Sequence, residues 1–243
     1  MRIEVNPQET SRAEAFEMWM TSPMPMVTLT KTFDVTRLYR MSRKLGIKFN
    51  TLLCWCIGKA ATQIEEFYYL PEKGKFYKFD CLAINVIVNN AKGGINSCDV
   101  PFTPDLQAFA QSYNALSAKA SQECKSAFLE DHIIVGTSAM IQTELDAIVN
   151  QYTDKFNNPL VMWGKYRKRG LCGWLSRRTG GWLSRTFGAS CCWLDGCFGS
   201  CFGSCFGSVS LPISLQFHHT QMDGGHAAGF LELLQREIKA VGR

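Results

Sequence analysis

The stretch LPISLQFHHTQMDGGHAAGFLELLQ, residues 211–235, joins two segments of different periodicity through a polar turn. Its first half is apolar and ends in two adjacent histidines, which predicts a strand that ends at His218 and His219. Its second half repeats apolar residues at helical spacing, which predicts a helix from about Gly225 to Ala240. A strand, a tight Asp-Gly turn and a helix therefore form the C-terminal part of the fold.

The histidines make this turn a candidate site. Three of the four histidines of the chain, His218, His219 and His226, lie within nine residues. An imidazole, which ordinarily titrates near pH ~6.5, is the usual general base at neutral pH. Successive strand residues face opposite sides, so only one of His218 and His219 can point into a given cleft. A histidine pair in a sheet is, by itself, more often structural than catalytic.

Helices and strands are mixed along the rest of the chain without strict alternation, which predicts an α+β fold around one large mixed sheet. We expect helices capped by Thr10 or Ser11, by Asp34 and by Asn50. The expected helices cover 11–20, 35–44, 49–66 and 104–125, and the expected strands cover 27–33, 67–70, 76–80, 82–88, 132–141 and 160–166.

Residues 167–210 depart from this pattern. They repeat GWLSR at Gly173 and Gly181 and then CFGS three times at a period of four. So many glycines and serines favour a low-complexity insertion in a single domain spanning 1–243. The cysteine period also raises the alternative of a zinc site, but the segment has no histidine and lacks the usual paired spacing, so no metal is expected. A further alternative is an exposed apolar loop that contacts a partner or blocks oligomer assembly.

Composition excludes several classes. The chain has 243 residues, 46% hydrophobic residues and a formal net charge of +5, which is too mild and too dispersed to indicate a nucleic-acid partner. It has no secretory h-region and no run of roughly 18 apolar residues, so we expect a cytoplasmic protein without a membrane span. The eleven cysteines are odd in number and are expected to be mostly free thiols.

The C-terminal motif resembles the signature of the chloramphenicol acetyltransferase family, LPxSxQxHHxxxDGxH. It is carried here by Leu211, Pro212, Ser214, Gln216, His218, His219, Asp223, Gly224 and His226. The segments RAEAFEMW (12–19), GIKFNTLLCWCIGKA (46–60) and NPLVMWGKY (158–166) are similar to other parts of the family in the same order. The resemblance spans nearly the whole chain apart from 167–210. A weaker similarity to the acyltransferase cores of 2-oxoacid dehydrogenase complexes follows from the HxxxDG motif.

This resemblance implies a CoA-dependent acyltransferase fold of two layers, a large mixed β-sheet packed with helices. It also implies a homotrimer with the site between subunits. Members transfer an acetyl group from acetyl-CoA, a co-substrate and not a permanently bound cofactor, to a hydroxyl of the antibiotic through a ternary complex. By position in the motif, His219 is the general base, and His218 faces the other way and packs.

The resemblance assigns further roles. Asp223 matches an aspartate that pairs with an arginine, for which Arg12 is the nearest candidate. Aligning SAMIQTELD with the family's strand places Glu144 at or next to the oxyanion-binding serine, with Thr143 as the nearest hydroxyl. Either Thr143 replaces the serine, the oxyanion is held differently, or the enzyme is slow. The positions where the family meets CoA are matched by Lys48, Lys165 and Tyr166.

The resemblance leaves two alternatives to a chloramphenicol O-acetyltransferase. One is an acetyltransferase for a different hydroxylated small molecule, because the residues of the acceptor pocket cannot be assigned from the motif. The other is a catalytically silent homologue that binds a ligand or partner, which the missing serine and the insertion would favour.

Overall fold

The elements that build the site are spread over the chain. The computed structural model describes residues 1–153, 155–169 and 207–242. In chain order the elements are β1 (Arg2–Val5), the 3-10 helix η1 (Pro7–Glu9), α1 (Ala13–Trp19), β2 (Met26–Asp34), α2 (Thr36–Leu45), α3 (Phe49–Ala61), the 3-10 helix η2 (Glu65–Tyr68), β3 (Tyr69–Glu72), β4 (Lys75–Phe79), β5 (Leu82–Asn89), β6 (Ile95–Pro101), α4 (Leu106–Glu123), β7 (Ile133–Met140), β8 (Leu160–Gly164), β9 (Arg167–Lys168), β10 (Val209–His218) and α7 (Gly224–Ala240).

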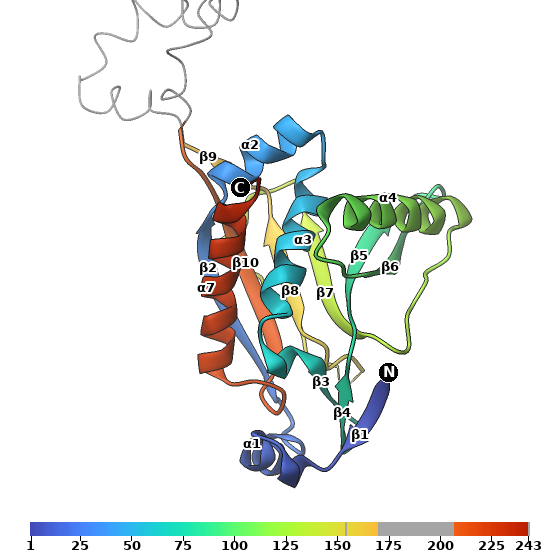
Figure 1. Cartoon of the computed structure of the whole chain (residues 1–243), viewed down its shortest axis with the longest axis vertical. Helices are drawn as coiled ribbons and strands as arrows, with labels where there is room; N and C mark the ends of the chain where they lie inside the picture. Colours follow the sequence, from blue (N-terminus) through green and yellow to red (C-terminus); the bar gives the residue numbers. More distant parts are fainter. Residues whose placement is uncertain (154, 170–206, 243) are drawn as a thin grey trace, which may run out of the picture.

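A mixed sheet runs through the structure in the order β2-β10-β8-β7-β5-β6, with β9 beside β10. β10 is antiparallel to β2 and β8, whereas β7 is parallel to β8 and β5. Figure 1 shows α3, α4 and α7 on one side of this sheet. A smaller antiparallel sheet has the order β1-β4-β3. The predicted α+β fold, a large mixed sheet packed with helices, is confirmed.

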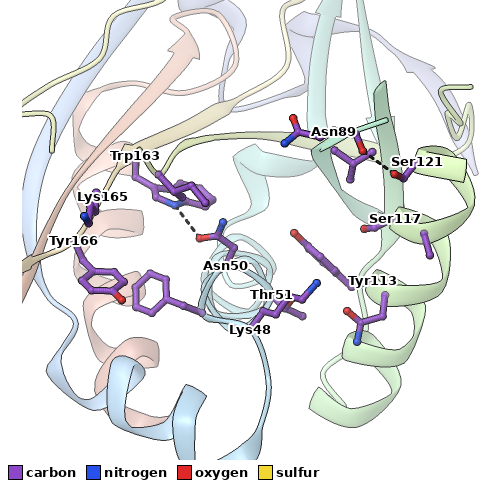
Figure 2. Close-up of a pocket in the computed structure, with 16 residues that line it drawn as sticks. Lys48, Asn50, Thr51, Asn89, Tyr113, Ser117, Ser121, Trp163, Lys165 and Tyr166 are labelled. Atoms are coloured by element: carbon purple, nitrogen blue, oxygen red, sulfur yellow. Dashed lines mark hydrogen bonds between the residues drawn. The ribbon is translucent and has the colours of Figure 1, made fainter. Parts of the chain in front are cut away.

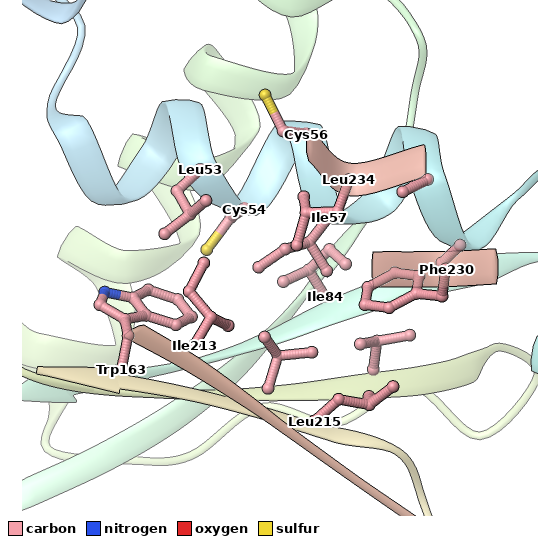
Figure 3. Packing of buried hydrophobic residues seen from close by; sticks show 14 of the residues in the cluster. Leu53, Cys54, Cys56, Ile57, Ile84, Trp163, Ile213, Leu215, Phe230 and Leu234 are labelled. Atoms are coloured by element: carbon pink, nitrogen blue, oxygen red, sulfur yellow. The ribbon is translucent and has the colours of Figure 1, made fainter. Parts of the chain in front are cut away.

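The hydrophobic core lies between the helices and the sheet. Figure 3 shows Ile213 and Leu215 of β10 below Ile57 of α3 and Phe230 and Leu234 of α7, all of them fully buried. Full burial of one such side chain contributes roughly 1.5–3 kcal/mol to folding. The apolar side chains of α7 and of one face of β10 therefore form one interface.

The other face of β10 is polar and equally buried. Ser214 and Gln216 point away from the helices and are 1% and 4% exposed. The Ser214 hydroxyl shares a 2.7 Å hydrogen bond with Thr30 and accepts the Ile148 N–H at 3.0 Å, while the Gln216 amide donates to the Asn150 carbonyl at 2.8 Å. Because β10 is covered on both faces and paired on both edges, its last residue is firmly placed.

Besides the two-residue β9, strands β1 and β6 were not predicted. β1 is short, and β6 reads INSCDVP, with Asn, Ser and Asp that disfavour strands. They form because β1 pairs with β4 and β6 pairs with β5 along its whole length. Pairing with a neighbour outweighs local propensity in both cases.

Helix boundaries also differ from those predicted. The helix expected over 49–66 ends at Ala61, and η2 follows after a break. Asn50 does not cap α3; its side chain accepts the indole N–H of Trp163 at 3.3 Å. Neither Thr10 nor Ser11 occupies the N-cap of α1, which is Arg12 without a side-chain cap.

The ends of the predicted insertion 167–210 belong to the sheet. Arg167 and Lys168 pair with Ser210 and Val209. The segment between them, 170–206, lies outside the described residues; it contains both GWLSR repeats and the CFGS repeats except for Gly207 and Ser208. Within the described ranges, no helix is long and apolar enough to span a lipid bilayer.

Candidate active site at the end of strand β10

The two adjacent histidines at the end of β10 have different environments. His218 is 1% exposed, and its Nδ1 accepts the Thr220 N–H at 3.2 Å. His219 is half-buried, and its own N–H donates to the Pro25 carbonyl at 2.8 Å. This is the arrangement expected from strand alternation, with His218 packed inside and His219 accessible.

The ring of His219 is fixed by an aromatic neighbour. It stacks on Trp19 at the end of α1, with ring centroids 4.4 Å apart and an interplanar angle of 14°. Nδ1 of His219 is buried and has no hydrogen-bond partner among the described residues. Any group that exchanges a proton with this ring must therefore approach Nε2. The sequence indicated the histidine, whereas Trp19 entered only as the last residue of the RAEAFEMW segment, without a role.

Arg12 joins the turn after β10 to the start of α7. Its Nη1 lies 3.1 Å from Oδ2 of Asp223, its Nη2 donates to the His219 carbonyl at 2.8 Å, and its Nε donates to the Thr220 carbonyl at 3.2 Å. The residue is only 4% exposed. The planar guanidinium thus holds the carbonyl of the candidate base and the motif carboxylate in one fixed geometry. The arginine proposed from the sequence is the one that contacts Asp223.

Asp223 is the N-cap of α7. Its Oδ1 accepts the N–H groups of Gly225 and His226 at 2.8 and 3.1 Å. Partial burial acts to raise the pKa of Asp223, but the His226 N–H, the His226 ring, Arg12 and the Gly225 N–H together hold that pKa below its ordinary value. The carboxylate therefore stays charged and fixes the turn at neutral pH.

The other end of the sheet carries a cavity of about 860 Å³. Figure 2 shows it between the start of α3, the end of β8 and α4, with the three predicted CoA residues, Lys48, Lys165 and Tyr166, on its wall. Thr51 and Ser117 also line it, but their hydroxyl oxygens are buried. Exposed lysines at the wall suit a ligand that carries phosphate groups.

The aromatic side of this cavity is already packed. The ring of Tyr166 contacts Tyr39 and Phe49, with centroids 5.3 and 5.1 Å away. Lys168 donates to the Tyr39 hydroxyl at 2.8 Å. Its Nζ also lies 5.8 Å from the centroid of the Tyr166 ring. The sequence did not single out Lys168, because its partner Tyr39 is 129 residues away.

The structure places Thr143 at the cavity end. Thr143 is exposed and lies beyond the end of β7, and its carbonyl accepts the Lys165 N–H at 2.7 Å. A Cβ on Gly164 would lie 2.9 Å from that carbonyl, so glycine permits the close approach.

Ser138 is a hydroxyl inside β7 that the sequence analysis did not single out. It is half-buried and in register with Met162 of β8, on the sheet face opposite to Thr137, whose hydroxyl donates to the Asn85 carbonyl at 2.7 Å. The bounds of β7 thus place a second hydroxyl, besides Thr143, near this region of the sheet.

A second cavity, of about 670 Å³, lies on the sheet face away from the helices. Its wall combines apolar side chains such as Phe128 and Phe156 with Asn85 and Gln216. Gln216 lies three residues before His219 on the same strand. Mixed apolar and amide groups of this kind suit a small molecule that carries hydroxyl groups.

His219 and the larger cavity are far apart within one chain. Trp163, on the cavity wall, pairs with Ile213. His219 is six residues further along, which is roughly 20 Å at ~3.3 Å per residue. The described residues contain no group of three or more His, Cys, Asp or Glu side chains that could hold a metal ion.

Comparison with known proteins identifies the fold. It is the fold of chloramphenicol acetyltransferase and of the catalytic cores of dihydrolipoamide acetyltransferases. A solved chloramphenicol acetyltransferase superposes with a TM-score of 0.72 at 16% identity and covers 98% of this chain and 100% of that one. A probable dihydrolipoamide acetyltransferase from Listeria monocytogenes gives a TM-score of 0.60 at 10% identity, covering 99% and 95%. The truncated core of the 2-oxoacid dehydrogenase complex from Thermoplasma acidophilum gives 0.61 at 12%, covering 99% of each chain.

Sequence similarity supports the same relationship. Chloramphenicol acetyltransferase 2 from Escherichia coli is 21% identical over 239 residues, which cover 96% of this chain and 94% of that protein. No protein-family model matches the chain.

Proposed function

We propose that the chain is an acetyl-CoA-dependent O-acetyltransferase with His219 as its general base. The observation that carries the proposal is the geometry at the end of β10. There Arg12 joins the His219 carbonyl to Asp223, and Trp19 fixes the ring. Such constraint on one imidazole, with only Nε2 accessible, is what proton abstraction from a bound hydroxyl needs.

In the proposed reaction, Nε2 of His219 takes the proton of an acceptor hydroxyl while that oxygen attacks the thioester carbonyl of acetyl-CoA. The tetrahedral oxyanion accepts a hydrogen bond from a hydroxyl donor and then expels the CoA thiolate, which receives the proton. The products are the acetyl ester and CoA, and no acyl-enzyme forms. Ser138, which lies on an internal strand, is the proposed donor, and Thr143 is the alternative.

Acetyl-CoA is proposed to bind in the 860 Å³ cavity. Lys48 and Lys165 would attract its phosphates. Tyr166 and its aromatic neighbours would contact the adenine. The acceptor is proposed to occupy the second cavity, on the sheet face away from the helices.

The site is proposed to be completed in a homotrimer. His219 and Ser138 lie far apart in one chain, because Ser138 is level with Ser214 through Met162. Large apolar side chains are exposed beside the helix-free face of the sheet: Ile87, Phe128, Val149 and Phe156 are 46%, 68%, 76% and 75% exposed. A second copy that covers them would bring its His219 to this face.

Chloramphenicol or a similar hydroxylated small molecule is the proposed acceptor. The 21% identity to a chloramphenicol acetyltransferase favours it. An enzyme for a different hydroxylated acceptor is the second candidate, because the second cavity presents two amides, Asn85 and Gln216, with which other hydroxyl patterns could pair.

The test is acetyl-CoA-dependent release of free thiol with chloramphenicol and with a panel of hydroxylated small molecules. His219→Ala is expected to lower kcat by roughly 10²–10⁴-fold. His132→Ala is the matched control, because His132 pairs with Asp131 and lines neither cavity. A folded, trimeric protein with no turnover on any acceptor would contradict the proposal and favour a silent binding protein.

A further inference from the structure

His226, the last residue of the histidine motif, lies between two carboxylates. Its Nε2 is 3.1 Å from Oε1 of Glu66, and its Nδ1 is 3.0 Å from Oδ1 of Asp223. The backbone N–H of Asp223 also points to Nδ1 at 3.4 Å. Glu66 comes from η2, a segment 160 residues away in sequence, so the contact depends on the tertiary fold.

These contacts continue to the candidate base. Oδ2 of Asp223 contacts Arg12, and Arg12 donates to the carbonyls of His219 and Thr220. A continuous series of polar contacts therefore runs from Glu66 through His226, Asp223 and Arg12 to the turn that carries His219.

Glu66 controls the hydrogen bonding of this series. A carboxylate only accepts hydrogen bonds, so Nε2 of His226 must carry the proton that points to it. Nδ1 of a neutral ring is then left to accept the Asp223 N–H, and Nδ1 of a charged ring donates to Oδ1 of Asp223. In both cases the ring ties Glu66 to the N-cap of α7.

We propose that Glu66 and His226 are positioning residues that hold Asp223, and through Arg12 the backbone of His219, in the geometry needed for proton abstraction. This inference rests on the proposed function. Glu66 touches neither cavity, so it acts on the reaction only through His226. The expected signature is a change in kcat with little change in KM.

The chain offers a matched control on the same 3-10 helix. The side chain of Glu66 is 13% exposed and faces His226, whereas that of Glu65 is 65% exposed and contacts Lys78 and Tyr69. Glu66→Gln and Glu65→Gln therefore remove the same charge from adjacent positions. Only Glu66→Gln removes the constraint on the His226 ring. An amide can present either its N–H or its oxygen to Nε2, so Nε2 need no longer carry the proton.

The first test is steady-state kinetics on the full-length protein. Glu66→Gln is expected to lower kcat roughly tenfold, with KM for acetyl-CoA unchanged within about twofold, as for the loss of one charge-assisted hydrogen bond. Glu65→Gln is expected to behave as wild type. In a His226→Ala background, Glu66→Gln is expected to have no further effect, because the series is already broken. Equal kcat for the two glutamine variants, or additive effects of Glu66→Gln and His226→Ala, would overturn the proposal.

The second test does not depend on turnover. With four histidines in the chain, ¹³Cε1-labelled histidine gives few NMR signals, which can be assigned by single substitutions. Glu66→Gln is expected to shift the His219 signal, whereas Glu65→Gln is not. A shifted His219 signal in a protein without acetyl transfer would support the positioning role while the proposed function fails. An unshifted signal in an active enzyme would overturn the positioning role alone.

Discussion

The two ends of β10 contrast in how their polar groups are used. At the His219 end, Arg12, Asp223 and His226 contact one another, and the backbone of the turn is bonded to them. At the cavity end, Lys48 and Lys165 are exposed and none of the described ion pairs involves them. One end is organised before any ligand arrives, and the other keeps its charges available for one.

This difference indicates which measured quantity, stability, kcat or KM, a substitution at each end of β10 should change. Changes at the organised end should alter stability and kcat, because they disturb groups whose positions are already set. Changes at the cavity end should alter KM, because they remove contacts made only with the ligand. Each prediction below tests that division.

After the loss of His219, the largest expected effect concerns the oxyanion donor, for which Ser138 and Thr143 are the candidates. Ser138→Ala is expected to lower kcat roughly 100-fold, because it removes the hydroxyl proposed to donate to the oxyanion. Thr143→Ala, the matched control at the exposed cavity end, is expected to change kcat by less than about twofold. The measurement is steady-state kinetics on both variants. A larger fall in kcat for Thr143→Ala than for Ser138→Ala would identify Thr143 as the oxyanion donor.

An intermediate effect is expected at Asp223. Asp223→Asn should lower the free energy of unfolding by about 1–3 kcal/mol, because it weakens a helix cap and leaves the buried Arg12 without its counter-charge. The measurement is urea denaturation of the wild type and the variant.

The pH dependence of this effect has a definite sign. The pKa of Asp223 is lowered in the folded chain, so its contribution is complete above the ordinary value of 3.8 and is lost as the pH falls through the folded pKa. The stability difference between wild type and Asp223→Asn should therefore be constant near neutral pH and narrow below about pH 4. A difference that grows on acidification would contradict the assigned role of the carboxylate.

The smallest effect is expected at the cavity. Lys48→Gln and Lys165→Gln should each raise KM for acetyl-CoA by roughly three- to tenfold with kcat unchanged, and added salt should reduce the difference. Lys75→Gln is the control, because Lys75 pairs with Glu4 away from the cavity. A fall in kcat instead of a rise in KM would contradict the division of roles between the His219 end and the cavity end of β10.

Prediction from sequence succeeded where the signal was local. The strand and helix of 211–235, the hairpin of β3 and β4, and β7 and β8 each show their periodicity within a few residues. It failed for β6, whose Asn, Ser and Asp give no strand signal, and for Asn50, which pairs with Trp163 instead of capping α3. Those outcomes depend on neighbours that are distant in sequence.

The candidate site also combines features with a local sequence signal and features that depend on distant residues. The sequence by itself determined that His219 lies at the end of a buried strand and that Asp223 lies at the start of the following helix. Alternation, helical spacing and the Asp-Gly turn are all properties of adjacent residues. Only the tertiary structure decided that Arg12 reaches Asp223 across 211 residues, that Glu66 meets His226, and that Ser138 lies inside β7. These pairings depend on sheet register and on helix packing, which bring distant segments together through burial of the shared core.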